Sequence, residues 1–178
     1  MAMATHTFEL FPGRTLHSAF YKDVKNSATL HKALLNQEFD AALINASLLV
    51  DPFQVYAAAS RVLLCETTTK LTTKGVHAEL VFNLSGSRNV TESFRRFGVT
   101  DDCSSLVLCV FDADDATLAN LASLVEGTLT PFDELGQHLT PADVKVIRKF
   151  YKIQDLELES STLVDAIVCR IATKSCNK

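Results

Sequence analysis

The sequence predicts an α/β fold, with a single domain over residues 1–178 in which helices pack on a mixed β-sheet. Two properties of the whole chain support this prediction. Its 178 residues are 47% hydrophobic and 21% charged, which is enough apolar material for one buried core. Short apolar runs also alternate with segments of helical period, and no repeat, linker or low-complexity tract divides them.

The central stretch from Val76 to Phe111 provides a third observation. It opens with a β-rich run over residues 76–84 and closes with the apolar run 106–111, which is short enough for a buried strand. Between these runs, Asn89 and Glu92 have the spacing of a capping box, and a glycine follows the helical segment as a stop. Strand, helix and strand in this order predict a central βαβ unit with parallel strands.

The N-terminal third predicts a hairpin, a helix and one more strand. Phe8–Phe11 is a short strand candidate that a proline-glycine pair stops, and Leu16–Val24 is its partner. Asn26 is placed to cap a helix that ends near Asn36. Residues 41–44 are expected to form another strand.

The remaining helices are predicted from their start signals. Asp51 as N-cap and Pro52 at the first helical position mark the clearest boundary, and this helix is expected to reach about Cys65. A polar loop, 66–75, follows it. The later helices are expected at 112–127, 140–151 and 161–174, with at most a short helix at 131–137.

Charge and cysteine usage exclude several classes of protein. A net charge of −4 argues against coating nucleic acid by bulk charge, although it permits a local basic patch. The five cysteines show no CxxC spacing, which favours reduced thiols in a protein of the cytoplasm and nucleus. The sequence shows no signal peptide, and no apolar run reaches about 18 residues, so no membrane partner is expected.

Motifs that bind phosphates, dinucleotides or zinc are absent from the sequence, as is a nucleophile elbow, so we expect no catalytic residue and no cofactor. An alternative is a small metal-dependent enzyme that uses the cluster Asp112, Asp114 and Asp115 at a strand end. The interpretation we favour is that those carboxylates solvate the strand end and stabilise the N-terminus of the next helix. The loop 83–88 is similarly either an anion site or a plain turn.

The C-terminal helix carries a cation in an unusual place. On a helical wheel Arg170 shares one side with Leu163, Ile167 and Ile171, and Lys174 follows on the same side. Such an arginine snorkels, pairs with a carboxylate or faces a partner. The alternative to a partner is that Arg170 is satisfied internally and Lys174 offsets the helix dipole.

A second basic cluster ends the preceding helix. It consists of Lys145, Arg148, Lys149 and Lys152. Such a run is usually a solvated face. If both clusters lie on one side of the fold, they form a patch that follows phosphates despite the acidic total charge.

Seven stretches in order along the chain resemble one family. They are Leu10–Pro12, Lys22–Asn26, Leu43–Asn45, Val50–Gln54, Glu79–Ser85, Phe97–Val99 and Thr162–Lys174. Together they are similar to the CGI-121 family, the small kinase-binding subunits of the KEOPS/EKC complex. Because the match runs through nearly the whole chain, it is more specific than any single motif.

The resemblance implies a non-catalytic subunit that binds a PRPK-type atypical kinase directly and the other KEOPS/EKC subunits through it. That complex carries out tRNA threonylcarbamoyladenosine modification on the adenosine beside the anticodon. Family members are also linked to recruiting tRNA by its 3′ CCA end. Combined with the charge pattern, this leads to two sets of expected contacts. The RNA-binding set is Lys70, Lys74, Lys149, Arg170 and Lys174, and the kinase-binding set is Leu163, Ile167 and Ile171.

Overall fold

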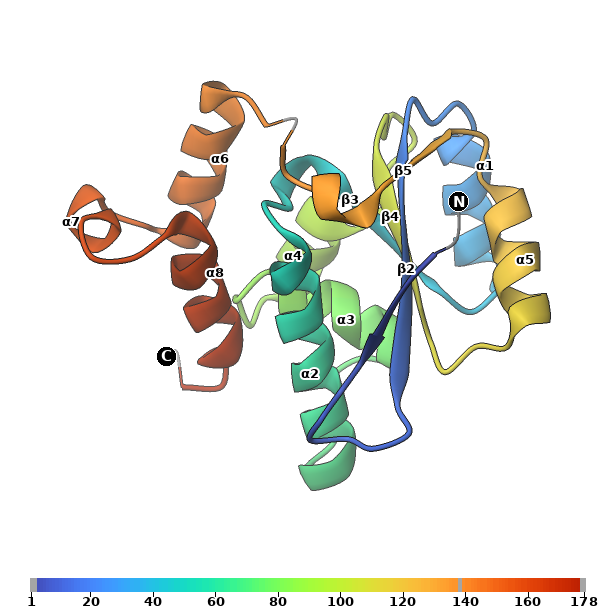
Figure 1. Ribbon diagram of the computed structural model, residues 1–178, viewed down its shortest axis with the longest axis horizontal. Coiled ribbons are helices and arrows are strands. Elements are labelled where there is room, and N and C mark those ends of the chain that lie inside the picture. Colours follow the sequence, from blue (N-terminus) through green and yellow to red (C-terminus); the bar gives the residue numbers. More distant parts are fainter. Residues whose placement is uncertain (1–2, 138, 177–178) are drawn as a thin grey trace.

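A five-stranded antiparallel sheet lies between two unequal layers of helices (Figure 1). The computed structural model describes residues 3–137 and 139–176. The strands run in the order β1 (Ala4–Thr7), β2 (Thr15–Lys22), β4 (Leu106–Phe111) and β3 (Ala42–Asn45), and β5 (Thr128–Thr130) pairs with β2. Each of these pairings is antiparallel.

Strand β4 is buried along its whole length and divides the interior into two cores. Because side chains alternate across a strand, Leu106, Leu108 and Val110 enter one core and the residues between them enter the other. We call the first the small core and the second the large core. The burial of both faces explains why β4 is apolar at every position instead of alternating.

Two helices, α1 (Ser27–Leu35) and α5 (Asp115–Leu124), cover the small core. Leu30 and Leu121 are the side chains that these helices bury most completely. Helix α5 begins where the carboxylate of Asp114 accepts a hydrogen bond from the Thr117 amide at 2.8 Å. Figure 1 shows both helices together on one side of the sheet.

The large core is covered by the remaining helices and two short 3-10 turns. They are α2 (Pro52–Thr68), α3 (Val76–Leu84), α4 (Val90–Phe97), α6 (Pro141–Tyr151), α7 (Asp155–Leu158), α8 (Leu163–Ala172), η1 (Ala46–Leu48) and η2 (Phe132–Glu134). Helices α3 and α8 both pack against α2, and α6, α7 and α8 lie outside it (Figure 1). In the part of the chain described, no helix is long and apolar enough to cross a membrane.

Most predicted boundaries are confirmed. The Asp51 carboxylate accepts from the Phe53 amide at 2.7 Å to cap α2, and Thr140 and Asp143 form the predicted capping box of α6. Helix α2 extends to Thr68, three residues beyond the expected end. The first strand was wrong in position, because Phe8–Phe11 forms a turn closed by a backbone hydrogen bond of 3.1 Å between its end residues.

The α/β class is confirmed, but the central βαβ unit and the mixed sheet are wrong. Val76–Leu84 is helix α3, not a strand, and the pairings described are all antiparallel. This helix is buried on most of its circumference, so it lacks the exposed polar face of an amphipathic helix. A short apolar run buried on all sides has the same sequence pattern in a helix as in a strand, which is why it was assigned to a strand.

Candidate functional site

Cationic side chains line three hollows on the outer, helical side of the large core. The α2–α3 hollow has a volume of about 430 Å³ and is lined by Arg61, Lys70, Arg88 and Lys174 among others. The second hollow, of about 810 Å³, lies between the α3–α4 loop and the end of α6. The third, of about 320 Å³, lies along α6.

Shared wall residues join these hollows into one basic tract. Arg88 lines both the first and the second hollow, and Lys152 lines both the second and the third. The cations of the tract are Arg61, Lys70, Arg88, Lys145, Arg148, Lys149, Lys152, Arg170 and Lys174. In the described part of the chain, the carboxylates in the same walls are Glu79 and Glu92. Arg148 and Arg170 are paired with Asp155 and Glu157, so the tract in this chain of net charge −4 owes its positive charge mainly to its other cations.

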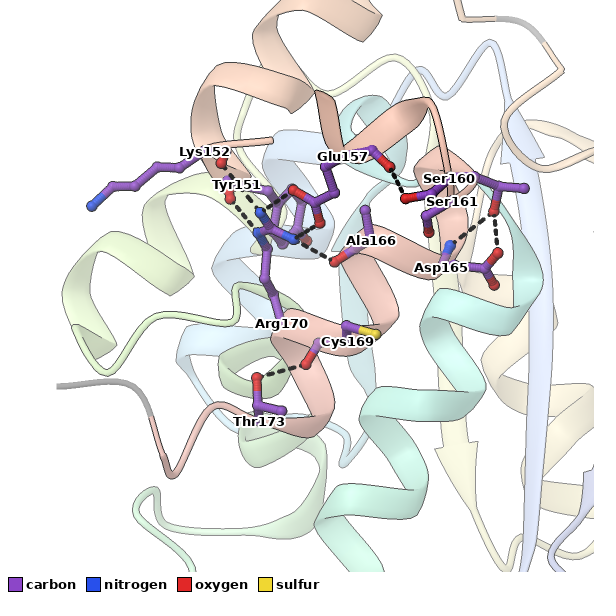
Figure 2. A network of polar contacts seen from close by, with 11 residues as sticks. Tyr151, Lys152, Glu157, Ser160, Ser161, Asp165, Ala166, Cys169, Arg170 and Thr173 are labelled. Atoms are coloured by element: carbon purple, nitrogen blue, oxygen red, sulfur yellow. Dashed lines mark hydrogen bonds and ion pairs between the residues drawn. The ribbon is translucent and has the colours of Figure 1, made fainter. Parts of the chain in front are cut away.

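Arg170 is engaged inside the fold (Figure 2). Its Nη1 and Nη2 atoms donate to the Glu157 carboxylate at 2.6 and 2.7 Å, and its Nε donates to the Tyr151 carbonyl at 2.5 Å. The carbonyls of Lys152 and Ala166 accept further bonds at 3.2 and 2.9 Å. Internal pairing, the alternative raised by the sequence, is what the structure shows, and it ties α6, α7 and α8 together.

Arg170 and Glu157 each stabilise the charged form of the other. The bidentate hydrogen bonds to Glu157 hold the pKa of Arg170 above its usual value. The same bonds hold the pKa of the Glu157 carboxyl below its usual value. Arg170 therefore keeps its charge at the wall of the second hollow while its side-chain donors are directed into the protein.

Lys174 is also turned inward and is only 2% exposed. Its Nζ lies 3.2 Å from the Phe82 ring centroid and donates to the Phe82 carbonyl, with Ser85 Oγ at 3.5 Å. Burial, followed by the nearby charge of Arg61, lowers the pKa of Lys174 to about 7. The lysine thus caps the last turn of α3, not the dipole of its own helix.

The other predicted RNA contacts face solvent. Lys70 is exposed at the rim of the α2–α3 hollow, and Lys74 is exposed in the loop between α2 and α3. Lys149 is exposed in the third hollow beside Lys145 and Lys152. The structure therefore brings Lys70, Lys149, Arg170 and Lys174 onto one connected path, with the lysines at 70 and 149 accessible to an anion.

The predicted kinase contacts lie mostly in the core. Ile167 and Ile171 have no exposed surface, and Leu163 is half-buried against the large core. In this conformation Leu163 is the one of the three that reaches solvent, and the kinase contact stays a prediction. The exposed large apolar side chains of the described residues lie elsewhere, and they are Leu10, Leu35, Phe53, Leu64, Phe94, Val146 and Leu156.

Two of the three aspartates in the predicted cluster have structural partners, and the third, Asp115, lies in the first turn of α5. Asp112 accepts from Arg14 Nε at 2.5 Å and from the Thr15 amide at 2.7 Å, while Asp114 caps α5. The hydrogen bonds from Thr117 hold the pKa of Asp114 below its usual value. Within residues 3–137 and 139–176, no three His, Cys, Asp or Glu side chains are grouped as metal ligands would be. The metal-dependent alternative therefore has no supporting geometry in this part of the chain.

Sequence reasoning missed several wall residues of the α2–α3 hollow. Arg61 lies on α2, and Glu79 and Asn83 lie one helical turn apart on α3. Their spacing of four residues within an apolar run was the available signal, because polar residues four apart share one side of a helix. When the run is interpreted as a strand, this spacing carries no information, because every second residue of a strand lies on the same face.

Comparison with known proteins places the chain among named relatives. Residues 21–175 match the family described as kinase binding protein CGI-121. The chain is 35% identical to the EKC/KEOPS complex subunit TPRKB of Danio rerio over 170 residues, which is 96% of this chain and 97% of the relative. It is 36% identical to the EKC/KEOPS complex subunit cgi121 of Aspergillus fumigatus over 174 residues, 89% of this chain and 90% of the relative. The cgi121 subunit of Schizosaccharomyces pombe is 31% identical over 169 residues, 90% of this chain and 96% of the relative.

Proposed function

This chain belongs to the CGI-121 family of kinase-binding proteins, and from that premise we propose that it is a non-catalytic subunit of a KEOPS/EKC complex. In this proposal it binds a PRPK-type atypical kinase and meets the other subunits through that kinase. It also helps to recruit tRNA by the 3′ CCA end for threonylcarbamoylation of the adenosine beside the anticodon. Its location in the cytoplasm and nucleus stays a prediction.

The basic tract is the observation that carries the RNA part of the proposal. Its cations are spread over three adjoining hollows instead of being gathered in one compact cavity. An extended path of positive charge suits a backbone with regularly spaced phosphates. Exposed lysines on this path, Lys70 and Lys149 among them, would meet phosphates, while Arg170 holds the supporting helices in place.

For the kinase contact we propose the outer side of α8. Leu163 would contact the kinase from its half-buried position, and Ile167 and Ile171 would hold the helix from inside. The family description supports a kinase partner, and the predicted residues lie on one helix.

Co-purification tests the kinase half. We expect a one-to-one complex with a PRPK-type kinase, weakened by Leu163→Glu but not by the control Leu118→Glu. Leu118 is a half-buried leucine on α5, on the opposite face of the sheet. No complex with the wild-type chain, or equal loss in both variants, would contradict the proposed surface.

Kinase ATPase activity, measured with and without tRNA and with and without this subunit, tests the recruitment half. We expect tRNA to change the activity only when the subunit is present. A stable complex whose ATPase activity does not change when tRNA is added would support a second function, that of a scaffold that binds the kinase and never RNA.

A further inference from the structure

The inner end of the α2–α3 hollow has an unusual set of polar groups. Arg61 Nε and Asn83 Nδ2 are buried N–H donors, and neither has a hydrogen-bond partner among the described residues. Both residues line the same hollow as Lys174. A buried donor without an acceptor costs free energy, so a pair of them beside a hollow favours a ligand that supplies acceptors.

The charge of the hollow indicates which acceptor fits. Among the residues that the structure describes, its walls hold Arg61, Lys70, Arg88 and Lys174 and one carboxylate, Glu79. That carboxylate already accepts from the Thr73 amide at 2.7 Å and from Thr73 Oγ1 at 2.8 Å. A dianion with several oxygens therefore matches the hollow better than a neutral acceptor or a single carboxylate.

The C-terminal segment forms one wall of this hollow. Arg61 Nη1 donates to the Ala172 carbonyl at 2.9 Å, and Arg88 donates to the Ser175 carbonyl. Lys174, between those two residues, reaches across to the Phe82 carbonyl at the end of α3. The wall thus consists of chain beyond α8, held by the same arginines that line the hollow.

We propose that the inner end of the α2–α3 hollow binds a small phosphate-type oxyanion, held by Arg61 Nε, Asn83 Nδ2 and Lys174 Nζ. An isolated oxyanion can bind here without the kinase or tRNA, so this inference can hold even where the proposed function fails. The phosphate belongs either to a small molecule or to an RNA, and the two sources share one recognition chemistry.

Binding should be coupled to the protonation of Lys174. The ionisable groups that act on its amine are Arg61 and Cys65 from α2 and Glu79 from α3. Its pKa of about 7 means that a bound dianion, by favouring the charged ammonium, draws a proton into the site. Affinity should therefore fall as the pH rises through neutrality.

Sulfate is a suitable probe, because its charge does not change near neutral pH. We expect saturable shifts of the Arg61 Nε–H and Asn83 side-chain NMR signals on sulfate titration. Sulfate affinity should be about tenfold higher near pH 6 than near pH 8, following the protonated fraction of Lys174. In Lys174→Met this pH dependence should vanish.

Two variants and a control distinguish sulfate binding at this site from the general attraction of anions to the basic tract. Arg61→Lys keeps the charge and removes the Nε donor, and Asn83→Leu removes the amide. Each should weaken sulfate binding by about tenfold. Lys145→Met removes a cation of the third hollow and should leave sulfate affinity within about twofold. Thermal melts confirm that each variant is folded.

Competition identifies the source of the phosphate. Displacement of sulfate by a short single-stranded RNA would place an RNA phosphate in the site, whereas displacement by a nucleoside monophosphate alone would indicate a small molecule. The proposal is overturned if neither Arg61 nor Asn83 signals move in the wild-type chain, or if Lys145→Met weakens binding as much as Arg61→Lys. Because the test uses neither kinase nor tRNA, its failure is separate from that of the proposed function.

Discussion

The two faces of the sheet share strand β4 but are built differently. On the small-core face, α1 and α5 pack directly over Leu106, Leu108 and Val110. On the large-core face several helices pack on one another, and the basic tract lies on their outer side. Helix α5 has no lysine or arginine, whereas helix α6, of nearly the same length, has three.

This difference leads us to expect that one face mainly stabilises the fold and that the other also binds partners. A single layer of helices closes the small core, and we expect it to contribute mainly to stability. The second layer on the large-core face creates surfaces between helices, where the half-buried Arg170 and the buried Lys174 donate to carbonyls at helix ends. Substitutions can test whether stability and binding separate along this line.

The largest expected effect is on the small core. Leu108→Ala removes a side chain that is 1% exposed and should lower the free energy of unfolding by about 2–5 kcal/mol. Urea unfolding measures this decrease. At a temperature where the variant is still folded, tRNA affinity should match the wild type, and a large drop in affinity would show that the two faces are coupled.

A smaller decrease in the free energy of unfolding is expected when a buried hydrogen bond on the large-core face is removed. The Tyr151 hydroxyl donates to the Leu84 carbonyl at 2.5 Å and accepts from Gln54 Nε2 at 3.0 Å. Tyr151→Phe removes this hydroxyl from the Leu84 carbonyl and from Gln54 Nε2. It should lower the free energy of unfolding, measured with urea, by about 1–3 kcal/mol. Gln54→Leu combined with Tyr151→Phe should cost less than the sum of the two single changes, since they share one bond. Strict additivity would contradict that coupling.

Charge reversal tests the binding role of the tract. Lys70→Glu with Lys149→Glu should weaken tRNA binding and reduce the slope of log K against log salt by about 0.7–0.9 for each phosphate that is no longer neutralised. Filter binding over a range of salt concentrations measures this slope. Lys32→Glu, at an exposed lysine on α1, changes the net charge by as much as either single reversal and is the control for each of them on the other face. An equal effect of Lys32→Glu would mean that net charge matters and the tract does not.

The smallest effect is a pH dependence from the Arg170–Glu157 pair. Because Arg170 lowers the pKa of Glu157 in the folded chain, the pair stabilises the protein above the ordinary glutamate pKa. That contribution disappears as pH falls through the lowered pKa. Glu157→Gln should therefore reduce the difference in melting temperature between neutral and acid pH. An unchanged pH profile would show that the pair contributes little to stability.

Local chemistry made much of the fold predictable. Asp51 with Pro52, Thr140 with Asp143, and Asn89 with Glu92 mark helix starts because a cap forms between residues two or three positions apart. The run 106–111 marks a strand because six apolar residues in a row suit a strand buried on both faces. The class of fold and the family resemblance follow from such local signals.

The tertiary structure decided what depends on residues far apart in sequence. Val76–Leu84 is helix α3, and its sequence does not reveal this because its neighbours bury it on most sides and remove the exposed polar face that distinguishes a helix from a strand. Arg170 is paired and Lys174 is buried because Glu157 and Phe82 lie within reach of them, 13 and 92 residues away. The basic tract also draws its cations from α2, α6, α8 and the segments between and beyond them. Short-range hydrogen bonds are visible in sequence spacing, whereas burial and long-range pairing exist only once the chain has packed.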